Sequence, residues 1–277
     1  MYEYYKNLEK FYKIAKNYYL WPKSKPFYRK YFSQFETFYR QFSPFAKPRT
    51  LGLHKADNRV VVDFERGFLY NRIPKAANTT LMSALYQDYF DESLSSNEVA
   101  GRGKSFHAVP SELREEKVDE VQKLYKFTFV RNPYSRILSA YLGKIGQPES
   151  RKEYRRKTPA LFRKFGDNPS FEDFCKYLAE GGAYDNKHWA PQISLLIFPP
   201  EEFDFIGKIE NLSQDFEQVI SNVPALEGNE IPGRVGTTTS ASDKLDQYYD
   251  KEKYDLIYEL YREDFQRFGY DKRKNDN

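Results

Sequence analysis

The stretch Phe68–Leu81, FLYNRIPKAANTTL, decides the fold of this chain. Its first part, Phe68–Ile73, is a short run of aromatic and aliphatic residues of the kind that predicts a strand. The residues Thr79–Phe90 have the spacing of a helix. A strand, a short loop and a helix in this order are a basic unit of an α/β fold.

The loop that leads into the helix, Pro74–Thr80, predicts an anion-binding site. Unpaired backbone N–H groups and the positive end of the helix dipole meet at a helix N-terminus, where they hold phosphate or sulfate. The loop is not a Walker A motif, because G-x-x-x-x-G-K-[ST] is absent and the lysine comes near the beginning of the loop. Taken alone, the loop is as compatible with a capped helix that carries a surface lysine. The residues that would hold an anion are small, basic or hydroxyl-bearing: Lys75, Ala76, Ala77, Asn78, Thr79 and Thr80.

A second strand-to-helix corner follows at Tyr125–Tyr141, YKFTFVRNPYSRILSAY. Arg131 comes directly after a predicted strand, Tyr125–Val130, and Ser139 lies about two turns along the helix that starts at Pro133. Both side chains reach one phosphate if this helix packs back against the strand end, with the arginine as a bidentate donor. The alternative is an ordinary corner in which Arg131 forms an ion pair.

The rest of the chain adds further strands and helices, which predicts a mainly parallel sheet flanked by helices. We expect strands at Val60–Val62 and Phe203–Ile209. We expect helices at Ser111–Leu124, from Ser170 to about Glu180, at Asn211–Val219 and at Lys251–Phe268. The remaining segments are predicted as a polar connection up to Phe106-His107, a charged loop or short exposed helix at 144–166, and a Gly/Thr/Ser loop at Gly228–Ser242.

Residues 1–58 form an aromatic and basic extension ahead of a domain at 59–277. Residues 1–50 hold eleven Lys or Arg against three Glu, and their aromatic residues show helical spacing twice. The two amphipathic helices that this pattern predicts would either pack on the rest of the protein or lie on an anionic membrane surface. Nucleic-acid binding is not expected, since no helix-turn-helix, zinc or RNA-binding pattern accompanies the basic residues.

Composition points to the cytoplasm. Cys175 is the only cysteine, which excludes an intrachain disulfide and a cysteine-based metal site. Charged residues interrupt every apolar run before the roughly 18–20 residues that a membrane-spanning helix needs, and the N-terminus lacks the apolar core of a signal peptide. We therefore expect a cytoplasmic chain, with peripheral membrane contact only through residues 1–50.

Five stretches of the chain are informative together: PKAANTTL (74–81), FTFVRNPYSRILSAY (127–141), HWAPQ (188–192), FDFIGKIENL (203–212) and YREDFQRFGY (261–270). They resemble the PAPS-dependent carbohydrate sulfotransferase family that includes the chondroitin and dermatan sulfotransferases. The resemblance covers roughly residues 66–270. It implies a P-loop-NTPase-like three-layer α/β fold. It also implies transfer of the sulfuryl group of PAPS, 3′-phosphoadenosine 5′-phosphosulfate, to a carbohydrate hydroxyl, with release of adenosine 3′,5′-bisphosphate and no metal.

The resemblance also assigns residues to the donor. Lys75 would have a catalytic role, holding the bridging oxygen as charge develops on the leaving group. Arg234 and Thr237–Thr239 lie in a Gly-flanked loop that could close over the nucleotide. The remaining assignments place the 5′-phosphosulfate on Lys75, Thr79, Thr80 and the backbone amides of Ala76, Ala77 and Asn78, and the 3′-phosphate on Arg131 and Ser139.

The chain departs from the animal members of that family, which are Golgi proteins with a membrane anchor and several cysteines. A soluble, bacterial relative fits the sequence better, and the acceptor stays open. The same donor would serve transfer to a protein tyrosine, a lipid or a small metabolite. A non-catalytic membrane-surface binding protein on the same fold is a further alternative.

The base that removes the acceptor proton is sought first among three histidines. His107 is the first choice, because it lies near a predicted strand end, where open α/β sheets build their sites. His188 is the rival, because it aligns with a recurrent position of the resembling family and neighbours Trp189, which could stack on a sugar ring. His54 precedes the recognisable domain. An acidic residue, or no strong base, is the other alternative, and Glu210 is expected to be structural or to orient the site.

Overall fold

The computed structural model of the chain describes residues 25–26, 56–90, 94–233 and 239–273. The described part is built on a four-stranded sheet in the order β1-β2-β3-β4. The strands are Val60–Asp63, Phe68–Asn71, Tyr125–Val130 and Phe205–Lys208. β1 is antiparallel to β2, whereas β2, β3 and β4 are parallel to one another. The predicted, mainly parallel α/β sheet is confirmed.

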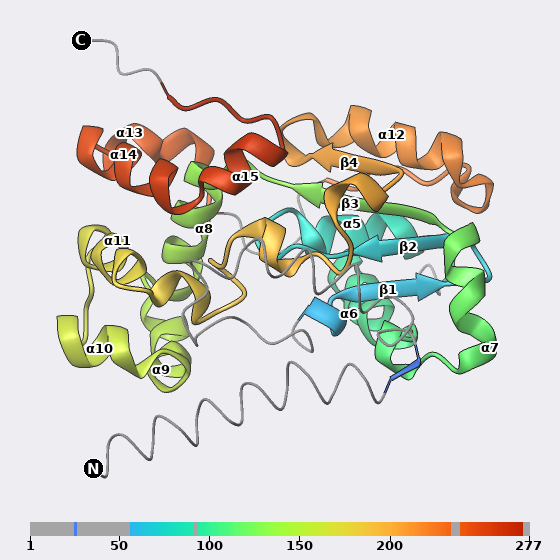
Figure 1. Ribbon diagram of the computed structural model, residues 1–277, viewed down its shortest axis with the longest axis horizontal. Coiled ribbons are helices and arrows are strands. Elements are labelled where there is room, and N and C mark those ends of the chain that lie inside the picture. The colour runs from blue at the N-terminus through green and yellow to red at the C-terminus, as the bar shows by residue number, and fades with distance from the viewer. Residues whose placement is uncertain (1–24, 27–55, 91–93, 234–238, 274–277) are drawn as a thin grey trace.

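Helices pack on both faces of the sheet and form a third group beside it (Figure 1). One face packs against α5 (Asn78–Tyr86), α6 (Ser96–Phe106) and α12 (Leu212–Asn222). The other face packs against α7 (Glu115–Val118) and the segment 193–198. The third group shares an aromatic-rich core and consists of α8 (Pro133–Lys144), α9 (Pro148–Lys157), α10 (Pro159–Phe165), α11 (Phe171–Ala179), α13 (Leu245–Tyr248), α14 (Lys251–Leu260) and α15 (Arg262–Arg267).

Alternation along β2 shows how the sheet is buried on both faces. Phe68 and Tyr70 belong to the core shared with α5 and α6, and Leu69 belongs to the core on the opposite face. All four residues of β2 are buried, as expected of a strand inside a parallel sheet. This burial fixes the carboxyl end of β2, from which the loop that begins at Pro74 reaches α5.

The predicted polar connection before His107 is wrong, because the chain forms α6 there. A capping box of Ser95 and Glu98 starts the helix. Gly103, which counts against a helix in the sequence, allows α6 to approach α5 closely. A Cβ atom at this position would lie 2.9 Å from the ring of Tyr86.

The predicted helix Ser111–Leu124 is also wrong. The segment consists of 3₁₀ turns on either side of the four-residue α7. Its buried side chains, Val118, Val121 and Leu124, are spaced by three residues, which matches the 3₁₀ repeat. Packing on the sheet therefore favours the tighter turns.

The predicted C-terminal helix Lys251–Phe268 is two helices, α14 and α15, which meet at Tyr261. Tyr261 is buried, and its hydroxyl donates to the carbonyl oxygen of Trp189 at 2.6 Å. This tertiary bond accompanies the break between the two helices. The charged segment 144–166 likewise contains two helices, α9 and α10, and Pro159 starts the second.

The amphipathic helices predicted for the N-terminal extension lie outside the described residues, which include only Lys25 and Pro26 of the first 55. Across the described ranges, no helix combines the length and the apolar character needed to span a membrane.

Candidate functional site

The loop between β2 and α5 has a backbone geometry suited to an anion. Lys75 and Ala77 both adopt left-handed conformations, with φ of 70° and 47°. Such conformations cost about 1–3 kcal/mol each for residues other than glycine, and they cluster at functional sites. No side chain caps α5, and its first helical hydrogen bond runs from the Leu81 N–H to the Ala77 oxygen. The first turn of a helix directs backbone N–H groups beyond the helix end, where an anion can accept hydrogen bonds from them.

The Lys75 ammonium group is held between this loop and α8. A Cβ atom on Gly143 of α8 would lie 2.8 Å from Lys75 Nζ, so the glycine leaves the space that the ammonium occupies. Burial, and then the positive charges of Lys144, Arg131 and Arg136, lower the pKa of Lys75 from 10.5 to about 8. A bound anion would offset these charges.

Arg131 faces the same loop from the end of β3. Its Nη1 donates to the Lys75 carbonyl oxygen at 3.3 Å, its Nε to Ser135 Oγ at 2.9 Å, and its Nη2 to Ser242 Oγ at 3.3 Å. Gln192 fixes the backbone of Arg131, because its Oε1 accepts the Arg131 N–H at 2.9 Å and its Nε2 donates to the Arg131 oxygen at 2.8 Å. In the described part of the chain no carboxylate lies within ion-pair distance of the guanidinium, so the predicted alternative of an ordinary ion pair is not what the structure has.

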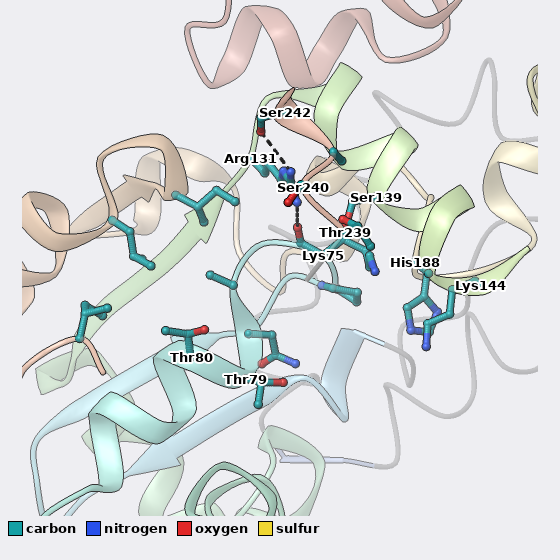
Figure 2. Close-up of a pocket in the computed structure, with 18 of the residues that line it drawn as sticks. Lys75, Thr79, Thr80, Arg131, Ser139, Lys144, His188, Thr239, Ser240 and Ser242 are labelled. Atoms are coloured by element: carbon teal, nitrogen blue, oxygen red, sulfur yellow. Dashed lines mark hydrogen bonds between the residues drawn. The ribbon is translucent and has the colours of Figure 1, made fainter. Parts of the chain in front are cut away.

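Ser139 lies two turns along α8 and points into the same space as Arg131 and Lys75 (Figure 2). Its hydroxyl oxygen accepts a hydrogen bond from Thr239 Oγ1 at 3.0 Å. Residues 239–243 therefore contact α8 next to the loop. Arg234 and Thr237 lie outside the described residues, so the predicted closing loop is described only from Thr239 onward.

These residues line one cavity of about 500 Å³, a volume within the range of small-molecule sites. Cationic side chains dominate its described lining, in which Lys75, Arg131, Arg59 and Lys144 stand against one carboxylate, that of Asp243. Arg59 and Lys144 were not among the predicted site residues. Neither was the apolar part of the lining, which consists of Ile209, Leu212, Ile231 and Pro232. The other predicted donor residues in the lining are Ala77, Asn78, Thr79 and Thr80, whereas Ala76 is fully buried.

His107 is not among the residues that line this cavity. Its ring stacks on Tyr86 with the centroids 4.5 Å apart, and its Nδ1 lies 3.8 Å from Asp63 Oδ2. Burial is the main cause that lowers the pKa of this imidazole. The structure therefore does not bring the first-choice base together with Lys75.

His188, the rival, does line the cavity and lies beside Lys144 (Figure 2). Its Nδ1 lies 2.8 Å from Asn186 Oδ1 and 3.1 Å from Tyr154 Oη. Burial lowers the pKa of this imidazole to about 2, and the charges of neighbouring cations, Lys144 first, act in the same direction. The ring is therefore neutral in the unliganded protein. His54 lies outside the described residues.

Arg136 is a structural residue of the site that the sequence analysis did not single out. It is fully buried and donates to three carbonyl oxygens, those of Pro74 at 3.1 Å, Ala190 at 2.7 Å and Lys187 at 3.3 Å. It thus connects α8 to the loop between β2 and α5, here called the anion loop (residues 74–77), and to the segment that carries His188. Its position five residues after Arg131, within the same motif, was the only feature of the sequence that pointed to it.

Glu210 has a structural role, which is one of the two roles predicted for it. Its Oε1 accepts the Asn132 N–H at 2.7 Å, and its Oε2 accepts the Tyr270 hydroxyl at 2.9 Å. It therefore holds the start of α8 against the end of β4 and the C-terminal segment. Asp264 acts similarly, since its carboxylate accepts the backbone N–H groups of Gln192 and Ile193 at 2.7 and 2.9 Å.

Comparison with known protein families agrees with this geometry. A family model described as "Sulfotransferase family" matches residues 58–271. This chain belongs to the sulfotransferase family. The predicted resemblance is thereby confirmed at the level of the family.

The sulfotransferase chain is also similar to curated relatives. It is 30% identical over 223 residues to carbohydrate sulfotransferase 14 of Mus musculus, covering 74% of this chain and 56% of the relative. It is 26% identical over 241 residues to carbohydrate sulfotransferase 11 of the same organism, covering 76% and 66%. It is 28% identical over 179 residues to carbohydrate sulfotransferase 12 of Xenopus laevis, covering 55% and 41%. The chain thus spans about two fifths to two thirds of these relatives, and no solved structure matches it.

Proposed function

We propose that this chain transfers the sulfuryl group of PAPS to a hydroxyl group of a carbohydrate. The observation that carries the proposal is a cavity whose lining has two parts with groups suited to anions. One part is the loop at the N-terminus of α5 with the Lys75 ammonium group. The other is Arg131 with Ser139. PAPS has phosphate groups at the 3′ and 5′ positions, so two such parts are what its recognition requires.

The lining of the cavity supports a nucleotide donor further. The backbone amides at the start of α5, with Thr79 and Thr80, suit the 5′-phosphosulfate. Arg131 and Ser139 suit the 3′-phosphate, to which arginine can donate through two N–H groups. The apolar stretch formed by Ile209, Leu212, Ile231 and Pro232 suits the adenine base.

In the transfer step an acceptor oxygen forms a bond to sulfur while the bond from sulfur to the bridging oxygen breaks. The electron pair of that bond stays on the 5′-phosphate of adenosine 3′,5′-bisphosphate. Lys75 would stabilise the charge that develops on this oxygen, which is the main task of a protein in a loose transfer of this kind.

His188 is the side chain that we propose as the base. It lines the same cavity as Lys75, and the acceptor proton would pass to its ring. Burial, and after it the surrounding cations, lower its pKa in the unliganded protein, and the negative charges of a bound donor would offset the part that the cations contribute. The basicity of His188 would therefore rise when the donor binds.

A carbohydrate acceptor is proposed because the most similar curated relatives reported above are named carbohydrate sulfotransferases. The particular sugar and the position of the reacting hydroxyl are properties of the acceptor that the donor geometry leaves open.

Calorimetric titration with adenosine 3′,5′-bisphosphate tests the donor. Lys75→Ala should weaken binding by about 10- to 100-fold, because a charge-assisted hydrogen bond contributes about 1.5–3 kcal/mol. The matched control is Lys123→Ala, which removes an exposed lysine far from the cavity lining and should bind as the wild type does. Absence of binding by the wild-type protein would overturn the proposal.

A further inference from the structure

The His188 ring is held by two oxygen atoms at its Nδ1 edge. Asn186 Oδ1 lies 2.8 Å from Nδ1, and Tyr154 Oη lies 3.1 Å from the same nitrogen. Tyr154 belongs to α9, and Asn186 lies in the turn that leads into His188. The ring is thus fixed from two separate parts of the chain, and Nε2 is the ring nitrogen left for the cavity that His188 lines.

The position of the Asn186 oxygen determines which ring nitrogen carries the proton. Besides Nδ1, this oxygen faces the backbone N–H of His188, which donates to it at 3.1 Å. Turning the amide over would set its NH₂ group against that N–H, so the oxygen has to occupy this place. A carbonyl oxygen only accepts hydrogen bonds, so Nδ1 must be the donor. A neutral imidazole has a single N–H, and Nε2 therefore keeps its lone pair.

Tyr154 alone would leave the tautomer undetermined, because a phenol hydroxyl can donate or accept. If the hydroxyl donated to Nδ1, the nitrogen lone pair would face the lone pairs of Asn186 Oδ1 at 2.8 Å, which is repulsive. With the proton on Nδ1, both oxygen atoms accept and no lone pairs are opposed. Asn186 is therefore the residue that determines which ring nitrogen of His188 carries the proton.

Burial and the neighbouring cations keep the His188 ring neutral, so the position of its single proton is the property that matters. Burial is the first cause that lowers the pKa of His188. Tyr154 adds no negative charge near neutral pH, because burial raises the pKa of its hydroxyl. Four cations act on the ring: Lys144 of α8, Arg59 directly before β1, Lys187 of the same turn, and Lys75 of the loop between β2 and α5.

We propose that Asn186 is the positioning residue that makes His188 Nε2 the proton acceptor of the reaction. This rests on the proposed function, with His188 as the base. As the acceptor oxygen bonds to sulfur and the bond to the bridging oxygen breaks, the acceptor proton passes to Nε2. The imidazolium that results keeps its Nδ1–H bonded to Asn186 Oδ1.

Nuclear magnetic resonance of the full chain, with ¹⁵N-labelled histidine, tests the tautomer without any turnover. The chain has three histidines, so His54→Gln and His107→Gln suffice to assign the signals. The expected result is a neutral His188 with its proton on Nδ1 at pH 7. In Asn186→Ala, part of the population should move the proton to Nε2, since the Tyr154 hydroxyl can then donate. A proton on Nε2 in the wild type, or an unchanged tautomer in Asn186→Ala, would overturn the proposal.

Kinetics then test the consequence for catalysis. Asn186→Ala should lower kcat by about 10- to 100-fold, within the contribution of about 10²–10⁴ that a positioned base makes, and should leave the affinity for adenosine 3′,5′-bisphosphate unchanged. Asn222→Ala, at an exposed asparagine of α12, is the matched control and should change neither quantity. Equal kcat in Asn186→Ala and wild type would contradict the positioning role.

Asn186→Asp provides a second test that does not depend on how well the alanine variant folds. The carboxylate accepts the same two hydrogen bonds and adds a negative charge beside Nδ1, so the pKa of His188 should rise and the acid limb of kcat should move to higher pH. An unmoved limb would count against the proposal. If kcat of His188→Ala equals that of the wild type, His188 is not the base, and the proposed role of Asn186 is wrong as well. The proposed donor site is tested separately, by titration with adenosine 3′,5′-bisphosphate.

Discussion

Lys75 combines a left-handed backbone, a largely buried ammonium group and several neighbouring cations. Its φ of 70° turns the side chain toward α8, where Gly143 leaves room for it. Burial and the neighbouring positive charges lower its pKa to about 8. Each of these features costs free energy in the unliganded protein, and a bound anion would offset the electrostatic part.

The pH dependence of nucleotide binding follows from this pKa. Lys75 loses its proton above pH 8 in the free protein, whereas a bound phosphate raises the pKa, so binding above pH 8 requires uptake of a proton. Affinity for adenosine 3′,5′-bisphosphate should therefore be nearly constant around pH 7, be lower by about twofold at pH 8, and fall by up to about tenfold per unit above it. Titration calorimetry from pH 7 to 9.5 measures this. In Lys75→Ala the affinity should not decline with pH. If it declines with the same slope as in the wild type, another group is responsible for the pH dependence.

Gly143→Ala should separate stability from binding. Replacing glycine by alanine in a helix stabilises it by about 0.5–1 kcal/mol, and the displaced atom is the mobile end of Lys75. The ammonium would nevertheless move, and nucleotide affinity should fall about tenfold. Gly101→Ala in α6, where a Cβ meets nothing within 4 Å, is the control and should gain stability without losing affinity. Thermal unfolding measures the stability of both variants, and calorimetric titration measures their affinity for the nucleotide. Unchanged affinity in Gly143→Ala would contradict the close approach of Lys75 Nζ to Gly143.

The sequence is informative about single residues only where their chemistry is visible in a motif. Lys75, Arg131 and Ser139 were predicted together, and they do line one cavity. Lys144 and Arg59 could not be assigned, because a basic residue in a helix or before a strand is usually a solvated one. The choice between His107 and His188 required the packing of α6 on α5, which places the first beside Tyr86.

At the scale of elements, α8 organises the site. Its start is held by Glu210, through the Asn132 N–H. Its interior contributes Ser139 to the cavity and Arg136 to the core. The strand-to-helix corner was predictable because Pro133 suits the first turn of a helix. The hydrogen bonds of Arg136 and Ser139 were not predictable, because they join segments that are more than fifty residues apart in the sequence.

Arg136→Met tests how much the tie between these segments contributes. The variant removes the donor to two buried carbonyl oxygens and to the partly buried Lys187 oxygen, and we expect a loss of about 3–5 kcal/mol in the free energy of unfolding. The melting temperature should fall by about 2–4 °C for each kcal/mol. The control is Arg163→Met at an exposed position of α10, which should stay within about 0.5 kcal/mol of the wild type. Equal stability of the two variants would contradict the structural role of Arg136.

At the scale of the whole molecule, the anion loop and the Arg131 corner belong to neighbouring parallel strands. β2 and β3 pair in parallel, so their carboxyl ends lie at the same edge of the sheet (Figure 1). Lys75 and Arg131, which follow these strand ends, both line the cavity. The strand pattern was sufficient to predict this arrangement. The positions of α6 and α7 were not predictable, because a close contact at Gly103 and burial on the sheet override local helix signals.

The central claim is that one cavity holds both phosphate-bearing ends of a single nucleotide, and calorimetry with two nucleotides tests it most directly. Wild-type protein should bind adenosine 3′,5′-bisphosphate about 10- to 100-fold more tightly than 5′-AMP, since Arg131 donates charge-assisted hydrogen bonds to the 3′-phosphate. In Arg131→Ala that preference should largely disappear, while 5′-AMP binds as before and still loses affinity in Lys75→Ala. An unchanged preference in Arg131→Ala, or no preference in the wild type, would contradict the account.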